Sequence, residues 1–573
     1  MQHDTDLQQA RRRIEAAYDP EALRAAGHRL ADLLADHLRK AERSEGKVLP
    51  WCDPAENVRL AGELLDRAVG QVANLPESRS ADERQIGNLP HLTERFAELV
   101  QTMLDHGHSL HDPRYIGHQV PAPVPLAGLF DAVGSVTNQP MAIYDMGPWA
   151  TAAEFALVER LGERIGWRRG EFAGLATHGG SLANLTGLLT ARNVTLKNVW
   201  QQGVAAGWGG SATATPTESA GWGGSCTATP TESAGWGGSC TATPTGIATA
   251  APTSNAPAPP VLVVHADAHY SVARAAGVLG LGTNQVLRVG LDAQRRIDPQ
   301  QLDDMLTDLR ARRHPVVAVV GCACSTPIGA FDRLGDVADV CARHGVWLHV
   351  DAAHGGAACL SGRHRHLVAG LERADSVVWD AHKMLFVPAL CAFVFYRRAA
   401  HKFEAFQQDA PYLFDPAAPG LAAFDSGLRT LECTKRAAAF GLWGVWALLG
   451  PQLLADLVDV TFALGRSFYE KLSAADDFVP LHEPQCNIVA FRHVPQELRD
   501  APRDVLGRFQ FELRRRVIES GEFYIVSTKL DGLGALRVTI INPLTTAAHL
   551  DLLLETLRRT GRQLLAEGLP ARL

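Results

Sequence analysis

The pattern of apolar and polar residues divides the chain into a helical beginning and a longer alternation of strands and helices. Residues 20–40 place leucines at helical spacing, with Arg, Asp and His on the other face. A second helical segment is predicted around 58–72, so 1–110 is interpreted as a helical N-terminal region. An apolar stripe without chemical groups predicts a packing surface, against either the rest of this chain or a second copy.

Beyond this region, short apolar runs bounded by polar residues alternate with helical patterns, beginning with a helix over 151–165. This alternation predicts an α/β protein whose largely parallel sheet carries helices on both faces. We assign a large domain to 111–440 and a small C-terminal domain to 441–573. The predicted buried strands lie at 261–264, 316–320, 346–351 and 376–380.

The large domain is interrupted at 201–260 by a segment of a different composition. The sequence Ala-Gly-Trp-Gly-Gly-Ser begins at 206, 220 and 234, a period of 14 residues, and each copy is followed by Thr-Ala-Thr-Pro-Thr. Repeats so rich in Gly, Ser, Thr and Pro bury too little apolar surface to offset their chain entropy. They predict a mobile surface insertion, with an adhesive tryptophan-bearing loop as the alternative.

Composition and charge narrow the class of protein. Hydrophobic residues make up 46% of the chain and charged residues 20%, which is typical of a soluble globular protein. The formal charge of -7 provides no basic surface for nucleic acid. No uninterrupted apolar span predicts a membrane helix, and the polar N-terminus lacks a signal-peptide core, so we expect a cytoplasmic protein. The 10 scattered cysteines predict reduced thiols rather than a disulfide framework or a metal site.

Chemically useful side chains follow the predicted strands. Lys383 comes directly after His382 at the end of one strand, and Asp351 ends another. His269 and Thr326 follow two further strands, at the sheet edge where open α/β proteins bind ligands. A strand-end lysine is usually a surface charge, but a partly buried one can lose its proton and attack a carbonyl.

A glycine-rich turn precedes the helix that is predicted to run through Ala191. Gly179 and Gly180 permit a close approach of the backbone, and the helix start after them presents free N–H groups and a positive dipole end. An ordinary turn with Ser181 as the helix cap is the alternative. A phosphate at this turn, a basic ring nitrogen beside Asp351 and an aldehyde captured by Lys383 together describe pyridoxal phosphate.

These motifs together resemble the group II pyridoxal-phosphate-dependent amino acid decarboxylases, which act on glutamate, cysteine sulfinate, diaminobutyrate or aromatic amino acids. His-Val-Asp-Ala-Ala at 349–353 and the pair His382 and Lys383 carry most of the resemblance, which covers nearly the whole chain except the repeats. It implies fold type I of pyridoxal-phosphate enzymes, with a mainly parallel sheet of seven-stranded type and a smaller C-terminal α+β domain. It also implies a homodimer with active sites near the subunit interface.

The resemblance further implies a role for each motif residue. Lys383 would hold the cofactor and release it to the substrate amine, and Asp351 would keep the ring nitrogen protonated. His269 would stack on the ring. The implied cofactor-binding residues are Lys383, Asp351, His269, Thr326, Ala353, His382, Gly180, Ser181 and Leu182.

Reaction type and substrate depend on residues outside this set. Tyr412 falls where relatives carry a tyrosine that protonates the product carbon, whereas aldehyde-forming relatives have phenylalanine there. Arg537 occupies the place of an arginine that binds the distal carboxylate of the substrate, a task that suits a guanidinium. His118 falls where the acidic branch has a glutamine, with Gln119 one residue later. Asp380 departs from the asparagine that is common before the histidine–lysine pair.

We therefore expect an enzyme that decarboxylates an L-amino acid to an amine, with acidic or small polar substrates ahead of aromatic ones. An aromatic amino acid decarboxylase, or an aldehyde-forming or transaminating enzyme of the same fold, is the alternative. An interaction protein built on a non-catalytic enzyme scaffold is the alternative from a different class.

Overall fold

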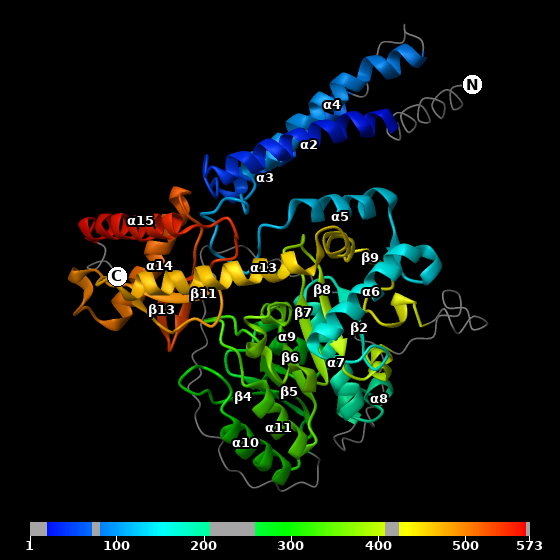
Figure 1. The fold of residues 1–573 in the computed structure, drawn as a ribbon, viewed down its shortest axis with the longest axis vertical. Helices are drawn as coiled ribbons and strands as arrows, with labels where there is room; N and C mark the ends of the chain where they lie inside the picture. Colours follow the sequence, from blue (N-terminus) through cyan, green and yellow to red (C-terminus); the bar gives the residue numbers. More distant parts are fainter. Residues whose placement is uncertain (1–19, 72–80, 207–257, 407–422, 569–573) are drawn as a thin grey trace, which may run out of the picture.

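The structure is a computed structural model that describes residues 20–71, 81–206, 258–406 and 423–568. Tyr412 and the 14-residue repeats lie outside these described residues. Figure 1 shows a large α/β unit, a smaller unit beside it that carries the last helices, and a helical arm that extends away from both.

The large unit is built on a seven-stranded sheet with the strand order β2-β8-β7-β6-β5-β3-β4. Strands β4, β3, β5, β6 and β7 run parallel, whereas β8 is antiparallel to both of its neighbours. The prediction of a mainly parallel sheet is therefore confirmed. Its strands are β2 (Ala173–Thr177), β3 (Val261–His265), β4 (Val286–Val289), β5 (Val316–Cys322), β6 (Leu348–Asp351), β7 (Ser376–Asp380) and β8 (Ala392–Tyr396).

Helices cover both faces of this sheet because consecutive strand residues point to opposite sides. Val377 and Trp379 of β7 pack into one apolar core, while Val378 between them packs into another. The first core is closed by α6 (Pro148–Ile165), α10 (Pro299–Ala311), α11 (Leu334–His344) and α13 (Phe440–Ser473). The second is closed by α7 (Gly180–Thr195) and α9 (Tyr270–Val278), and α8 (Val199–Ala206) follows α7.

The smaller unit contains a four-stranded antiparallel sheet with the order β10-β11-β13-β12. Its apolar core includes Phe491, Leu536 and Leu550, which come from two strands and the last helix. This arrangement agrees with the predicted α+β architecture of the C-terminal region. Its elements are β10 (Phe478–Pro480), β11 (Ile488–His493), α14 (Arg503–Ser520), β12 (Val526–Leu530), β13 (Leu533–Thr539) and α15 (Ala547–Ala566).

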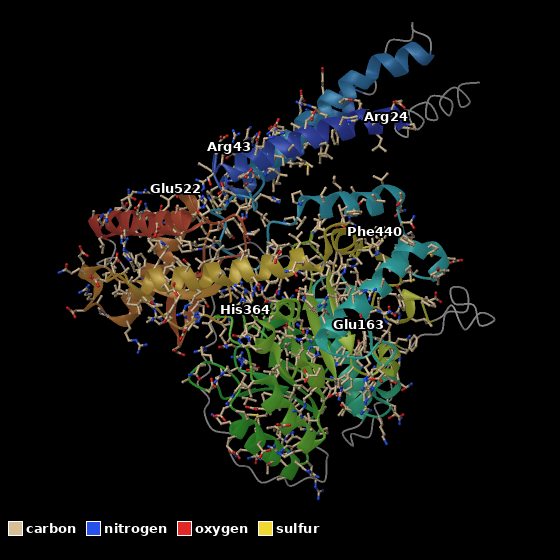
Figure 2. All side chains as sticks on the ribbon, viewed as in Figure 1. Arg24, Arg43, Glu163, His364, Phe440 and Glu522 are labelled. Carbon is tan, nitrogen blue, oxygen red and sulfur yellow. The ribbon has the colours of Figure 1, made fainter. Side chains whose placement is uncertain are left out.

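The N-terminal region is helical, as predicted, and forms the arm of Figure 1. Its base contacts the small unit, where the N–H of Val48 donates to the carbonyl of Gly521 at 2.9 Å. Figure 2 accordingly shows Arg43 near Glu522, whereas Arg24 lies far out along the arm. The helices of this region are α2 (Pro20–Glu42), α3 (Pro54–Gln71) and α4 (Ala81–His106), and α5 (Pro125–Thr137) follows as the first helix of the large unit.

Helix α13 links the two units and starts at Phe440, which Figure 2 shows beside α5. It is the one helix of the described residues that is long and apolar enough to cross a membrane by length and composition. Gly450, whose φ of 77° is not helical, interrupts it, and Pro451 follows. Leu442, Val445 and Leu454 of α13 are buried in the core beneath the large sheet, so α13 packs here as a core helix. The two-stranded pair β1 (Pro140–Met141) and β9 (Lys435–Arg436) lies near its start.

Candidate active site

A cavity of about 360 Å³ lies at the carboxyl ends of β5, β6 and β7. This is the edge at which parallel sheets bind ligands, because the strands end there and loops and helix starts converge on it. Eight of the residues predicted for the site line this one cavity, although they come from distant parts of the chain. They are Gly180, Ser181, His269, Thr326, Asp351, Ala353, His382 and Lys383.

Lys383 stands at the end of β7 with its amine held beside a carboxylate. Its Nζ lies 3.3 Å from Oδ2 of Asp380, and its side chain keeps 22% of its surface exposed in an otherwise buried wall. His382 faces the same carboxylate, with Nε2 at 3.6 Å, while its Nδ1 pairs with the carbonyl of Cys391 at 2.8 Å. Lys383 is thus anchored by a charge partner and accessible from the cavity, so a carbonyl group bound there could reach its amine.

The glycine turn forms the start of α7, as the sequence indicated. Gly179 adopts a φ of 104°, which side-chain-bearing residues rarely adopt, and the helix begins at Gly180. The first N–H groups of a helix have no intrahelical partner and attract anions. The N–H of Leu182 already donates to the carbonyl of Gly179 at 3.1 Å, and Leu182 does not line the cavity. Of the predicted turn, Gly180 and Ser181 therefore face the cavity.

Asp351 is held by a residue that the sequence analysis did not single out. Nδ2 of Asn184, on α7, donates to Oδ2 of Asp351 at 2.9 Å, and the N–H of Ala353 donates to Oδ1 at 3.1 Å. Both carboxylate oxygens are thus fixed by donors that stabilise the ionised form. Asp351 is 9% exposed, so this carboxyl group is held in a fixed position at the cavity wall.

Asn184 also determines the proton position on His269. Its Nδ2 donates a second bond to Oγ of Ser271 at 3.1 Å, and the Ser271 hydroxyl then points its hydrogen to Nδ1 of His269 at 2.8 Å. The N–H of Ser271 donates to the same Nδ1 at 3.3 Å. Burial, the largest cause, lowers the pKa of His269, so the ring is neutral near pH 7 and carries its proton on Nε2.

The other side of Asn184 is fixed by a buried histidine. Its Oδ1 accepts from Nε2 of His349 at 2.9 Å, and Nδ1 of His349 pairs with the Ser376 hydroxyl at 2.7 Å. Burial holds the pKa of His349 at about 4, so this ring is neutral and donates only through Nε2. Asn184 therefore has one orientation, set by Asp351 and His349 on β6 and by Ser271 on α9.

The two predicted substrate-binding residues lie near one another, but neither lines the cavity. The charge of Arg537 is one cause, after burial, of the lowered pKa of His118, whose ring lies 5.7 Å from that of Tyr524. Gln119, one residue later, lines the cavity instead, because neighbouring residues of this irregular segment point in different directions. Gln119, rather than His118, therefore lines the cavity. The substrate-binding roles of His118 and Arg537 stay predictions.

Two further polar residues that line the cavity could not be identified from the sequence, because their hydrogen-bond partners are distant along the chain. Nδ1 of His178 pairs with Oε1 of Glu432 at 2.9 Å, and Nε2 of His354 pairs with Oδ1 of Asn487 at 2.9 Å. Burial, the largest cause, lowers the pKa of His354 to about 3. The available signal was position in the sequence, because His178 directly precedes the glycine turn and His354 directly follows the strand-end motif at 349–353.

The residues of the cavity fit pyridoxal phosphate. They offer an accessible amine on Lys383, the carboxyl group of Asp351 for a cationic ring nitrogen, and a glycine-rich helix start for a phosphate. The space over Gly180 is tight, because a Cβ built there would lie 2.6 Å from Oδ2 of Asp380. Of the two carboxylates that line the described cavity, Asp380 is the one without an assigned role toward this cofactor.

Comparisons with known proteins agree with this geometry. Residues 247–494 match the family model described as pyridoxal-dependent decarboxylase conserved domain. The chain is 27% identical over 556 residues to cysteine sulfinic acid decarboxylase of Rattus norvegicus, which covers 95% of this chain and 98% of that protein. It is 26% identical to the acidic amino acid decarboxylase GADL1 of Mus musculus, over 93% of this chain and 85% of that protein. The crystal structure of mouse CSAD superposes with a TM-score of 0.74 at 25% identity, covering 95% of this chain and 99% of that chain.

Proposed function

The chain belongs to the group II pyridoxal-phosphate-dependent amino acid decarboxylases, and from this premise we propose that it converts a small acidic L-amino acid to its amine and carbon dioxide. The reaction class follows from the family. The preference for cysteine sulfinate or aspartate over larger or aromatic substrates is supported by the relatives named above and by one feature of the site.

The feature that carries the substrate proposal is the guanidinium of Arg537. It is 6% exposed and, within the described part of the chain, has no carboxylate partner. Its Nη2 donates to Oγ1 of Thr539 at 3.3 Å, whereas its buried Nε has no hydrogen-bond partner there. Burial lowers its pKa to about 10, which still leaves it charged near pH 7. A buried cation without a counter-charge is costly, so an anionic ligand group next to it would be strongly stabilised.

Arg537 does not line the cavity, but its charge acts on residues that do. Its charge contributes, after burial, to the lowered pKa of His354 and acts on the thiol of Cys324, and both of these residues line the cavity. A substrate whose amine approaches Lys383 would therefore direct a short acidic side chain toward Arg537. A long or aromatic side chain would replace this ionic contact with a buried unpaired charge.

The remaining groups of the wall divide the chemistry among them. Pyridoxal phosphate, when bound, supplies an electron sink for the electron pair left by departing carbon dioxide. Asp351, fixed by Asn184 and the N–H of Ala353, holds a negative charge for the ring nitrogen of that cofactor. His269 offers a neutral ring with Nε2–H, a donor that can orient the carboxylate that leaves. Lys383 supplies the amine that binds the cofactor and exchanges it with the substrate amine.

The proposal is tested by assaying carbon dioxide and amine from cysteine sulfinate, aspartate, glutamate, diaminobutyrate and tyrosine. Arg537→Met should lower kcat/KM for cysteine sulfinate and aspartate about 100-fold, the loss expected for a bidentate charge-assisted contact. Arg492→Met is the matched control, because Arg492 is a partly buried arginine of β11 that does not line the cavity. Equal losses on acidic and non-acidic substrates, or an aromatic amine as the main product, would contradict the proposal.

We further propose that the active form is a homodimer assembled through α5 and the helical arm. Three residues of α5, Leu129, Val133 and Val136, are 60%, 54% and 64% exposed, an apolar surface that a monomer would leave in water. Val133→Glu should produce a monomer by light scattering, whereas Val278→Glu, at an exposed apolar position of α9, should not. A dimer that withstands Val133→Glu would exclude this surface. The cytoplasmic location stays a prediction.

A further inference from the structure

Asp380 ends β7 as a carboxylate buried in the cavity wall. It is 2% exposed, and its Oδ2 faces Nζ of Lys383 at 3.3 Å and Nε2 of His382 at 3.6 Å. Its Oδ1 is buried as well and has no hydrogen-bond partner among the described residues. A buried oxygen without a partner is costly in a folded protein, so its position calls for a ligand or a proton.

This unpaired carboxylate oxygen is directed at the start of α7. A Cβ built on Gly180 would lie 2.7 Å from Oδ1 and 2.6 Å from Oδ2 of Asp380. Only a glycine permits this approach, and Gly180 is also the residue at which the helix begins. The positive end of α7, which would hold the cofactor phosphate, is therefore already faced by an anionic side chain.

A phosphate at this helix start would meet a carboxylate of the same sign in a dry environment. A phosphate held by the first N–H groups of α7 would repel the charged Asp380 carboxylate, so keeping both groups charged would carry an electrostatic cost. Asparagine is common at this position in the family that the chain resembles. Its amide would avoid this cost, because it is neutral and can donate a hydrogen bond.

The charges around Asp380 do not remove the conflict. Burial, the largest cause, raises the pKa of Asp380, while Lys383 and His382 oppose this rise and Asp351 adds to it. An arriving phosphate acts in the same direction as Asp351. The titratable groups that face Asp380 are Lys383, His382, Asp351, His269 and Cys391.

We propose that Asp380 takes up one proton from solvent when the cofactor phosphate binds at the start of α7. Its neutral carboxyl group then donates a hydrogen bond, which an ionised carboxylate cannot do. Cofactor loading by this chain therefore becomes weaker as the pH rises, unlike loading at a site with an amide in this position. The inference rests on the proposed function, because it requires that the cavity hold a pyridoxal phosphate.

The test uses the cofactor-free full chain and 4-deoxypyridoxine 5-phosphate, which carries the phosphate but has no carbonyl for Lys383. Calorimetric titration in two buffers of different ionisation enthalpy gives the number of protons taken up on binding. At pH 8, above the second phosphate pKa of about 6, the wild-type chain should take up about one proton more than Asp380→Asn. The wild-type dissociation constant should rise about tenfold per pH unit from pH 7 to 9, and that of Asp380→Asn should change far less.

Two controls separate this coupling from general effects. Asp131→Asn removes another carboxylate whose pKa is raised by burial but which does not line the cavity, so its proton uptake should match that of the wild type. 4-Deoxypyridoxine without the phosphate should bind with equal proton uptake in the wild type and Asp380→Asn.

The outcomes distinguish the inference from the function on which it rests. Binding with the same proton uptake and the same pH dependence in the wild type and Asp380→Asn overturns the role of Asp380 while the cofactor site stands. Failure of both proteins to bind either the analogue or pyridoxal phosphate overturns the cofactor site and the inference with it. Circular dichroism of Asp380→Asn verifies that the variant is folded in each case.

Discussion

Replacing Asn184 by alanine should weaken cofactor binding, although Asn184 need not touch the cofactor. The substitution removes the donor to Oδ2 of Asp351, the donor to Ser271 and the acceptor of the His349 Nε2–H. Asp351 retains the N–H of Ala353 but loses its partner on the other oxygen, and the proton position on His269 is no longer fixed. Asn184 is thus a positioning residue for both groups.

The size of the effect follows from the bonds that are lost. A hydrogen bond to a charged group contributes about 1.5–3 kcal/mol, and the bond to Asp351 is of this kind. If this difference appears in cofactor binding, the dissociation constant rises about 10- to 150-fold, at about 1.4 kcal/mol per factor of ten. The buried His349 donor left without a partner adds about 1–3 kcal/mol of destabilisation to the fold.

The assay is a fluorescence or absorbance titration of cofactor-free protein with pyridoxal phosphate, together with thermal denaturation. Thr190→Ala is the matched control: Thr190 is a buried polar residue of the same helix that donates to the hydroxyl of Tyr396 at 3.0 Å, away from the cavity. It should lower the thermal midpoint and leave the cofactor affinity unchanged. Asn184→Ala with a normal dissociation constant and only a lowered midpoint would refute the positioning role.

Three further predictions concern the fold, its pH dependence and the product. Lys435→Met leaves the buried Glu154 without its partner, so unfolding should become easier by about 3–5 kcal/mol in denaturant titration, and Glu154→Leu in addition should restore most of this loss. The pKa of His349 is about 4 in the fold and 6.5 ordinarily, so the unfolded chain binds more protons between these two pH values. The free energy of unfolding should therefore fall as the pH drops from 6.5 toward 4. His349→Gln should reduce this pH dependence by about one proton, which is measured as a smaller shift of the thermal midpoint with pH. Tyr412→Phe should shift the product from amine toward aldehyde, ammonia and peroxide with oxygen consumption, and an unchanged product ratio would argue against the proton-donor role.

The strand-end chemistry could be predicted from the sequence because strand periodicity and parallel topology together define one edge of the sheet. Asp351 and Lys383 end adjacent strands, and His269 and Thr326 follow others, so their meeting in one cavity follows from the strand pattern alone. The glycine turn before α7 was recognisable for the same reason, since its conformation requires glycine locally.

The residues that position these groups could not be predicted in the same way. Asn184 lies within an ordinary helical pattern, and its partners are 87, 165 and 167 residues away along the chain. The choice between His118 and Gln119 depended on the path of an irregular loop, which carries no periodicity. Asp380 was visible as a departure from the family pattern, but its conflict with the helix start emerged only from its distance to Gly180.

The central claim is tested most directly by decarboxylation of cysteine sulfinate and aspartate that carry a label in the α-carboxyl group. The full chain is loaded with pyridoxal phosphate, and the amine and the labelled carbon dioxide are measured together. We predict equal amounts of amine and carbon dioxide, loss of both in Lys383→Ala, and retention of the cofactor on Lys383 after borohydride reduction, detected as a mass increase on that residue. Unlabelled gas, aldehyde as the main product, or undiminished activity of Lys383→Ala would contradict the account.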